Sequence, residues 1–178
     1  MKKEIIISGF GGQGVMAIGK NLVEAGMAEG LEVTWAPSYG PEMRGGTANC
    51  HVVLSTKPVG SPLFTYPTEL IAMNAPSLEK FVPMVKSGGL VFVNSSVVKD
   101  RVERPDLKVE YVPCAEIAYE IGNPKVGNMV MLGAYIGATG ALKPETVRAM
   151  IEHMFAGPKA KLVPLNMKAL EAGIACAQ

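Results

Sequence analysis

Residues 3–14 read KEIIISGFGGQG, an apolar run of strand length that ends in glycines. Such a run is typical of a strand buried on both faces, as in a parallel sheet. From Val15 to about Glu29 the apolar residues fall at spacings of three and four, which predicts a helix, and Gly30 follows as a helix-ending glycine. A second strand over Glu32–Ala36 completes the pattern of a Rossmann-like βαβ unit.

Apolar strand-length segments and helical periodicities alternate along the rest of the chain. We expect strands over residues 47–55, 70–73, 90–94 and 109–113, with a helix over residues 77–86. The C-terminal third reads as helical, with helices over residues 115–121, 128–139, 144–155 and 166–177. The sequence therefore predicts one α/β domain over residues 1–178, with a mostly parallel sheet flanked by helices and a helical C-terminal third.

Composition narrows the class of protein. The chain has 178 residues, of which 48% are hydrophobic and 19% charged, and its net charge is +1, as in ordinary soluble globular proteins. It contains no basic run, and only 6% of its residues are aromatic, so we expect no nucleic-acid partner. The apolar runs are shorter than the roughly 18 residues of a membrane helix, and the N-terminus lacks the pattern of a signal peptide. We expect a cytoplasmic protein without a membrane partner.

The cysteines and histidines offer little chemistry. Cys50, Cys114 and Cys176 are widely spaced, and no Cys-x-x-Cys occurs. This argues against a disulfide framework and against a self-contained zinc or iron–sulfur site. His51 falls in an expected strand, where we expect it to be half-buried, and His153 falls on an expected helix, where we expect it to be exposed.

Gly9 to Gly14 satisfies the pattern G-x-G-x-x-G between a strand and a helix. Glycines there permit a tight turn and a close approach of backbone amides to a phosphate. The candidate cofactor-binding residues of this loop are Gly11, Gly12, Gln13 and Gly14. The alternative is that the glycines serve only turn geometry and packing.

Two nucleotide motifs fail a closer test. An NAD or FAD site places an acidic residue at the end of the second strand, but the sequence there is Trp35-Ala36-Pro37-Ser38. Residues 14–21 have the glycine–lysine spacing of a P-loop. However, Asn21 replaces the Ser or Thr that binds magnesium, and the segment is expected to be helical. Both motifs are therefore disfavoured.

Residues 38–46 read SYGPEMRGG and are too rich in Gly and Pro for a helix or an interior strand. A hydroxyl, a phenol, a carboxylate and a guanidinium within seven residues of a stiff loop indicate a contact surface. Arg44 is suited to bind a phosphate or carboxylate bidentately, with Glu42 orienting it and Tyr39 adding a hydrogen bond. The candidate residues are Ser38, Tyr39, Glu42, Arg44, Gly45 and Gly46. The alternative is a structural turn with a solvated Glu–Arg pair.

The sequence lacks a nucleophile elbow, a histidine metal motif and a Gly-Asp-Gly motif followed by paired asparagines, the pattern of a thiamine-diphosphate site. The chain is therefore well folded but catalytically incomplete, which indicates a subunit of a larger enzyme.

Several blocks resemble the gamma subunit of 2-oxoacid:ferredoxin oxidoreductases. They are residues 9–15, the segment 38–46, Cys50, residues 61–62, 70–74 and 88–89, Glu116–Ala118 with Gly122-Asn123, and residues 128–134. Asn74 departs from the acidic residue expected there. The length and the block 128–134 resemble the 2-oxoglutarate type, with pyruvate and ketoisovalerate types as alternatives.

The resemblance implies a complex that decarboxylates a 2-oxoacid on thiamine diphosphate, passes electrons through [4Fe-4S] clusters to ferredoxin and releases an acyl-CoA. It implies alpha and beta partner subunits, and a delta subunit where the complex has one. Thiamine diphosphate and the clusters would be held by those partners, while the gamma part lies in the coenzyme A region without catalytic residues. A stand-alone nucleotide-binding oxidoreductase and a purely structural scaffold subunit remain the alternatives.

Overall fold

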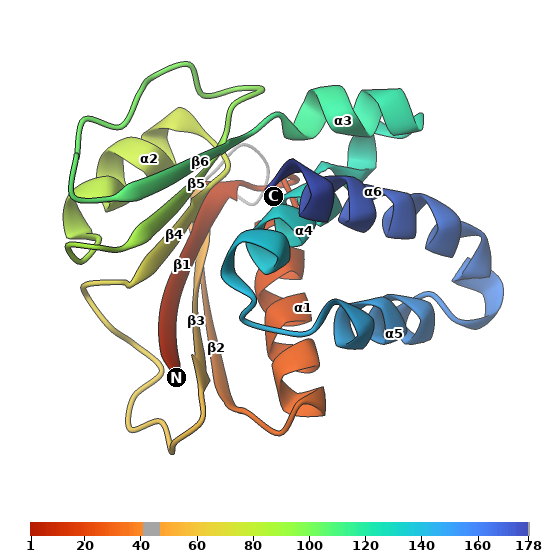
Figure 1. Ribbon diagram of the computed structural model, residues 1–178, viewed down its shortest axis with the longest axis horizontal. Helices are drawn as coiled ribbons and strands as arrows, with labels where there is room; N and C mark the ends of the chain where they lie inside the picture. The colour runs from red at the N-terminus through yellow and green to blue at the C-terminus, as the bar shows by residue number, and fades with distance from the viewer. Residues whose placement is uncertain (41–46, 178) are drawn as a thin grey trace.

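The computed structural model describes residues 1–40 and 47–177, which form a single α/β domain around one sheet (Figure 1). The strands are β1 (Lys2–Phe10), β2 (Glu32–Tyr39), β3 (Thr47–Ser55), β4 (Glu69–Ala72), β5 (Leu90–Asn94) and β6 (Lys108–Val112). The helices are α1 (Val15–Ala28), α2 (Ala75–Phe81), α3 (Cys114–Ile121), α4 (Gly127–Thr139), α5 (Pro144–Met154) and α6 (Val163–Cys176). Short 3₁₀ turns are η1 (Val82–Met84), η2 (Pro124–Val126) and η3 (Gly157–Leu162). The α/β class and the helical C-terminal third are confirmed.

The six strands lie in the order β2-β3-β1-β4-β5-β6. Parallel pairs join β1 to β4, β4 to β5 and β5 to β6, while β3 runs antiparallel to both β1 and β2. The strands β1 and β2 therefore share a direction, as a βαβ unit requires, but β3 separates them. The short connection from β2 to β3 makes these two strands antiparallel neighbours, and β3 pairs with β1 along its other edge.

Alternation along each strand divides the core into two clusters, one on each face of the sheet. Ile5 and Ile7 of β1 belong to the larger cluster, together with residues of α1 and of α3 to α6, whereas Ile6 belongs to the smaller cluster with residues of α2. Figure 1 shows α1, α4, α5 and α6 on one side of the sheet and α2 on the other. The fully buried central strands explain why the sequence of β1 is a continuous apolar run.

The helices α4 and α6 pack with their backbones in close contact. A Cβ atom added to Gly133 would lie 2.1 Å from the carbonyl oxygen of Leu170, and one added to Gly173 would lie 2.0 Å from that of Val130. Only glycine fits at either position without separating the helices. This contact explains how α4, which is apolar around most of its surface, buries all of its residues 129–136.

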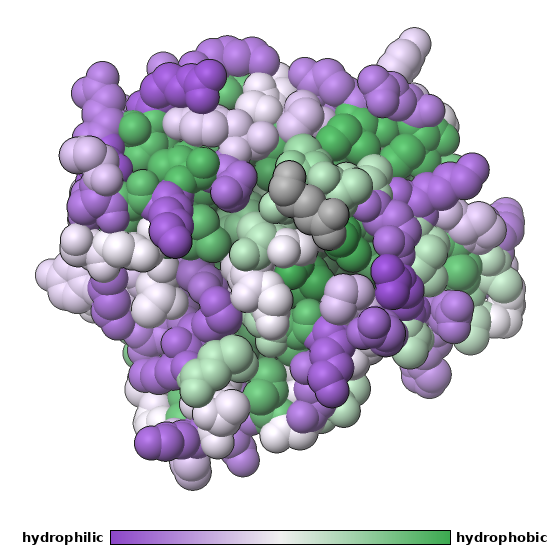
Figure 2. Space-filling model, in the orientation of Figure 1, coloured by the Kyte–Doolittle hydropathy of each residue, from purple (hydrophilic) through white to green (hydrophobic). Residues whose placement is uncertain are grey.

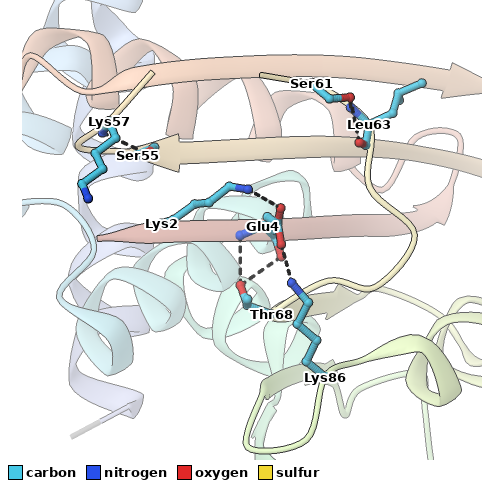
Figure 3. A network of polar contacts seen from close by, with 8 residues as sticks. All are labelled: Lys2, Glu4, Ser55, Lys57, Ser61, Leu63, Thr68 and Lys86. Atoms are coloured by element: carbon cyan, nitrogen blue, oxygen red, sulfur yellow. Dashed lines mark hydrogen bonds and ion pairs between the residues drawn. The ribbon is translucent and has the colours of Figure 1, made fainter. Parts of the chain in front are cut away.

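Ionic networks occupy the amino ends of the central strands. Glu4 of β1 accepts hydrogen bonds from Lys2 Nζ at 2.7 Å and Lys86 Nζ at 2.6 Å, and its backbone N–H donates to Thr68 Oγ1 at 2.9 Å (Figure 3). On the opposite face, the buried Glu69 accepts hydrogen bonds from Lys3 and from the phenol of Tyr135 in α4. Both carboxylates are thereby compensated, which is the condition for placing charge near a core.

Candidate functional site

Four parallel strands end at one edge of the sheet, and the segments that follow them surround a cleft of about 450 Å³. The glycine loop follows β1, Met73 follows β4, Asn94 closes β5, and Cys114 begins α3 after β6. Lys125 of η2 and Asn128 at the start of α4 close the other side. Because ligands of open α/β sheets gather at the carboxyl ends of the strands, this cleft is the candidate site.

Backbone conformation and close packing both constrain the glycine loop. Gly12 and Gly14 have φ values of +94° and +75°, in the left-handed region that favours glycine. A Cβ atom on Gly14 would lie 2.6 Å from Cβ of Asn128, whereas one on Gly12 would have nothing within 4 Å. Gly14 is therefore fixed by packing against α4 as well as by its conformation. Gly12 leaves open space where a ligand can approach the backbone.

Gln13 braces the loop with its own side chain. Its Oε1 accepts a hydrogen bond from the backbone N–H of Phe10 at 2.7 Å, and its Nε2 donates to the carbonyl oxygen of Met73 at 2.9 Å. Asn74 fixes the next turn, because its Oδ1 accepts from the N–H of Ser77 at 2.9 Å and caps α2. The Gln13 amide thus holds β1 to β4, even though the residue also lines the cleft.

Helix starts contribute positive potential to this cleft. Gly14 directly precedes the first turn of α1, and Gly127 and Asn128 begin α4. No side chain caps the start of either helix. Uncapped first-turn amides carry partial positive charge. The exposed ammonium group of Lys125 adds a full charge at the rim. An anionic group suits this arrangement, and sequence analysis missed Lys125 and Asn128 as site residues.

A second, more apolar hollow of about 310 Å³ lies on the other side of the glycine loop. Its lining includes Gly11, Gly12, Met16 and Tyr39. The structure therefore brings the glycine loop and Tyr39 together, although they are far apart in the sequence. The two hollows share Gly12 and Gly14, so one elongated ligand could contact both.

The structure places the predicted segment 38–46 only in part. Ser38 and Tyr39 are the last residues of β2, paired with Asn49 and Ala48, so the expectation that they lie in a loop is wrong. An edge strand tolerates the preceding Pro37, which lacks an N–H. Ser38 and Tyr39 alternate and so point to opposite faces of β2. The other predicted residues of this segment, Glu42, Arg44, Gly45 and Gly46, lie outside the described residues.

Cys114 lines the cleft, whereas His51 and His153 do not. Burial raises the pKa of the Cys114 thiol to about 12, so it stays protonated at neutral pH. Burial also lowers the pKa of His51, which is half-buried as expected and packs against Phe64. His153 is exposed on α5, again as expected.

Three other features bear on function: the P-loop-like spacing, metal-binding clusters and membrane-spanning helices. The segment with P-loop spacing lies within α1 except for Gly14, which confirms that this motif is coincidental. Among residues 1–40 and 47–177, no group of three or more His, Cys, Asp or Glu side chains is arranged to hold a metal ion. In the same residues, every helix is too short or too polar to cross a membrane.

Comparison with known proteins supports a single family. The family described as pyruvate ferredoxin/flavodoxin oxidoreductase matches residues 4–176. The ketoisovalerate oxidoreductase subunit VorA of Methanothermobacter marburgensis is 43% identical over 169 residues, which are 94% of this chain and 35% of that protein. The chain thus spans about a third of the length of the VorA relatives.

Other relatives are closer to this chain in size. The 2-oxoglutarate synthase subunit KorC of Methanocaldococcus jannaschii is 36% identical over 154 residues, covering 85% of this chain and 82% of that protein. The crystal structure of the keto/oxoacid ferredoxin oxidoreductase gamma subunit from Geobacter sulfurreducens PCA superposes with a TM-score of 0.83 at 29% identity, covering 98% of each chain. The match over residues 4–176 includes the glycine loop and the residues of the carboxyl-edge cleft. It shows that the chain belongs to the pyruvate ferredoxin/flavodoxin oxidoreductase family.

Proposed function

We propose that this chain is the gamma subunit of a 2-oxoacid:ferredoxin oxidoreductase complex. The family match over residues 4–176 carries this proposal, and relatives of similar length that are named as subunits support it. The complex would convert a 2-oxoacid and coenzyme A to an acyl-CoA and carbon dioxide, with reduction of ferredoxin. Partner subunits alpha and beta, with delta where present, would supply thiamine diphosphate and the iron–sulfur clusters.

The residues of this chain do not fit an iron–sulfur cluster. A [4Fe-4S] cluster takes four thiolates, and the whole chain has three cysteines. Burial raises the pKa of Cys50 and of Cys114 to about 12, which disfavours the thiolate form that binds iron. We therefore assign no electron-transfer step to this polypeptide.

We propose coenzyme A as the ligand of the carboxyl-edge cleft. Its phosphates match the amides near Gly12 and Gly14 and the ammonium group of Lys125, because helix starts and lysines attract anions. Its apolar arm matches the neighbouring hollow beside Met16 and Tyr39. In this proposal the chain binds and orients coenzyme A, and Glu42 and Arg44 add a charged pair from the following segment.

The identity of the 2-oxoacid is a finer proposal. The relatives' names divide between ketoisovalerate, pyruvate and 2-oxoglutarate. The block 128–134 favours 2-oxoglutarate, since it resembles the 2-oxoglutarate type. A complex purified through this subunit should therefore reduce ferredoxin fastest with 2-oxoglutarate among these three acids.

The test uses the assembled complex and varies coenzyme A. Lys125→Ala should raise the KM for coenzyme A about tenfold and leave the KM for the 2-oxoacid unchanged, since one phosphate contact is lost. The matched control is Lys168→Ala, an exposed lysine on α6 outside the cleft. If the KM for coenzyme A does not change in Lys125→Ala, the result would favour the purely structural scaffold role. Binding of NAD(P) or FAD to the isolated chain in calorimetry would instead favour a stand-alone nucleotide-binding oxidoreductase.

A further inference from the structure

A groove of about 620 Å³ lies on the α2 side of the sheet, between α2 with η1 and the segment before β6. Its apolar lining consists of Ala75, Leu78, Val82, Pro83 and Val102. Figure 2 shows hydrophobic surface, bordered by hydrophilic side chains, in the region that α2 occupies in Figure 1. This groove lies away from the cleft proposed for coenzyme A and shares no lining residue with it.

The two walls of the groove are tied together. Arg104 Nη1, from the segment before β6, donates to the carbonyl oxygens of Val82 at 3.0 Å and Val85 at 2.9 Å. The backbone N–H of Val102 donates to the hydroxyl of Tyr111 at 3.0 Å, which holds the same wall to β6. The groove is therefore preformed, and a preformed surface loses little entropy when it binds a partner.

The rim of the groove carries carboxylates without internal partners. Glu79, Asp100 and Glu103 all line it. Within residues 1–40 and 47–177, none of these three takes part in an ion pair, in contrast to Glu4 and Glu69 at the amino ends of the strands. Three negative charges therefore lie beside the apolar lining of the groove without a cationic partner among the described residues.

The two arginines of the groove do not offset this charge. Arg104 forms an ion pair with Asp106, and its Nε donates to Asp106 Oδ1 at 3.0 Å. Arg101 lies over the ring of Tyr111, with 4.4 Å between its guanidinium carbon and the ring centroid. Because one arginine is neutralised and the other opposes three carboxylates, the rim is net negative.

We infer that this groove binds an amphipathic segment of another polypeptide of the complex, with apolar side chains toward Leu78 and Val82 and Lys or Arg residues at the rim. Charge complementarity favours a basic segment, because the carboxylates of the rim would repel an acidic segment as it binds. The inference rests on the proposed role as a subunit, but it concerns a separate face and a contact that holds the assembly together.

The decisive experiment identifies the occupant chemically. Pro83 is exposed in the groove and is replaced by the photo-crosslinking residue p-benzoylphenylalanine in the full chain, which is purified within its complex. Irradiation should link it to a peptide of another subunit that has apolar residues and at least two Lys or Arg nearby. The same residue at exposed Glu152 on α5 should not give this product. A link to an acidic peptide, a link to a second copy, or no link within an assembled complex overturns the inference.

A charge-reversal pair provides the second measurement. Glu79→Lys with Glu103→Lys should weaken binding of the partner subunit about tenfold, with the loss reduced at high salt. Glu145→Lys with Glu152→Lys on α5 changes the net charge equally and should leave assembly unchanged. If the wild-type chain assembles and the groove pair assembles equally well, only the groove inference fails. If the wild-type chain assembles with no oxidoreductase subunit, the proposed function itself fails.

Discussion

The two ends of the sheet differ in how they treat charge. At the amino ends of the strands, Glu4 and Glu69 are each compensated by hydrogen bonds from side chains of the same chain. At the carboxyl ends, the cleft is lined by glycine backbone, by amides such as Gln13 and Asn128, and by the exposed Lys125. The amino end satisfies its charged groups internally, whereas the carboxyl end leaves the ammonium group of Lys125 exposed.

This difference separates residues that stabilise from residues that bind. A compensated carboxylate contributes to the free energy of unfolding because removing it leaves its partners without a counter-charge. An outward-facing donor is solvated without a ligand, so its loss affects binding more than folding. Substitution of the compensated carboxylates at the amino end should therefore change stability, and substitution of the outward-facing Lys125 at the carboxyl end should change ligand affinity.

The largest effect is expected at the buried amino end. Glu69→Ala should lower the free energy of unfolding by about 3–5 kcal/mol, because it leaves Lys3 and the buried hydroxyl of Tyr135 without their acceptor. Urea denaturation measures this loss. Glu32→Ala, at an exposed position of β2, removes the same charge and should change stability by less than about 0.5 kcal/mol. A loss below about 1 kcal/mol for Glu69→Ala would show that the amino-end carboxylates do not stabilise the fold.

A smaller loss is expected where the glycine loop meets α4. Gly14→Ala should cost about 1–3 kcal/mol, because its φ of +75° strains any Cβ and that atom would lie 2.6 Å from Asn128 Cβ. Gly12→Ala is the matched control, since its φ of +94° is also left-handed but the added methyl group has nothing within 4 Å. The difference between the two variants in chemical denaturation isolates the packing component. Equal losses would mean that α4 does not constrain the loop.

Local patterns predicted most of the fold. The apolar run of β1, the helical spacing of α1 and Gly30 at its end each agree with the structure, because each depends on neighbouring residues alone. The position of β3 between β1 and β2 was not predicted. Strand order depends on which distant segments bury the most surface together, and no short motif encodes that choice.

The candidate site was only partly predictable for the same reason. The glycine loop carries a motif, so Gly12 and Gly14 were found from the sequence. Lys125 and Asn128 carry none, and they join the cleft because η2 and the start of α4 lie beside the glycine loop. Gln13 was predicted as a binding residue, and its hydrogen bonds to Phe10 and Met73 reveal a bracing role that the motif does not express.

The smallest effect is a pH dependence at the exposed part of the amino end. Burial raises the pKa of Glu4, but the hydrogen bonds and charges of Lys2 and Lys86 lower it by more. The pKa of Glu4 therefore lies below the ordinary 4.5. A carboxyl with a depressed pKa stabilises the folded state above its unfolded pKa, and this contribution is lost as pH falls through the folded pKa. Because the side chains of Lys2 and Lys86 are 57% and 49% exposed, solvent screens the pair and we expect about 1 kcal/mol.

Denaturation of the wild type and of Glu4→Gln at a series of pH values measures this contribution directly. The difference in free energy of unfolding should be present at neutral pH and should shrink once the solution is more acidic than the ordinary Glu pKa of 4.5. High salt should reduce it at neutral pH, since both lysines face solvent. A difference that stays constant with pH and salt would assign Glu4 a neutral hydrogen-bonding role. In that case charge compensation at the amino end would belong to the buried Glu69 alone, and the contrast between the two ends of the sheet would be confined to its core.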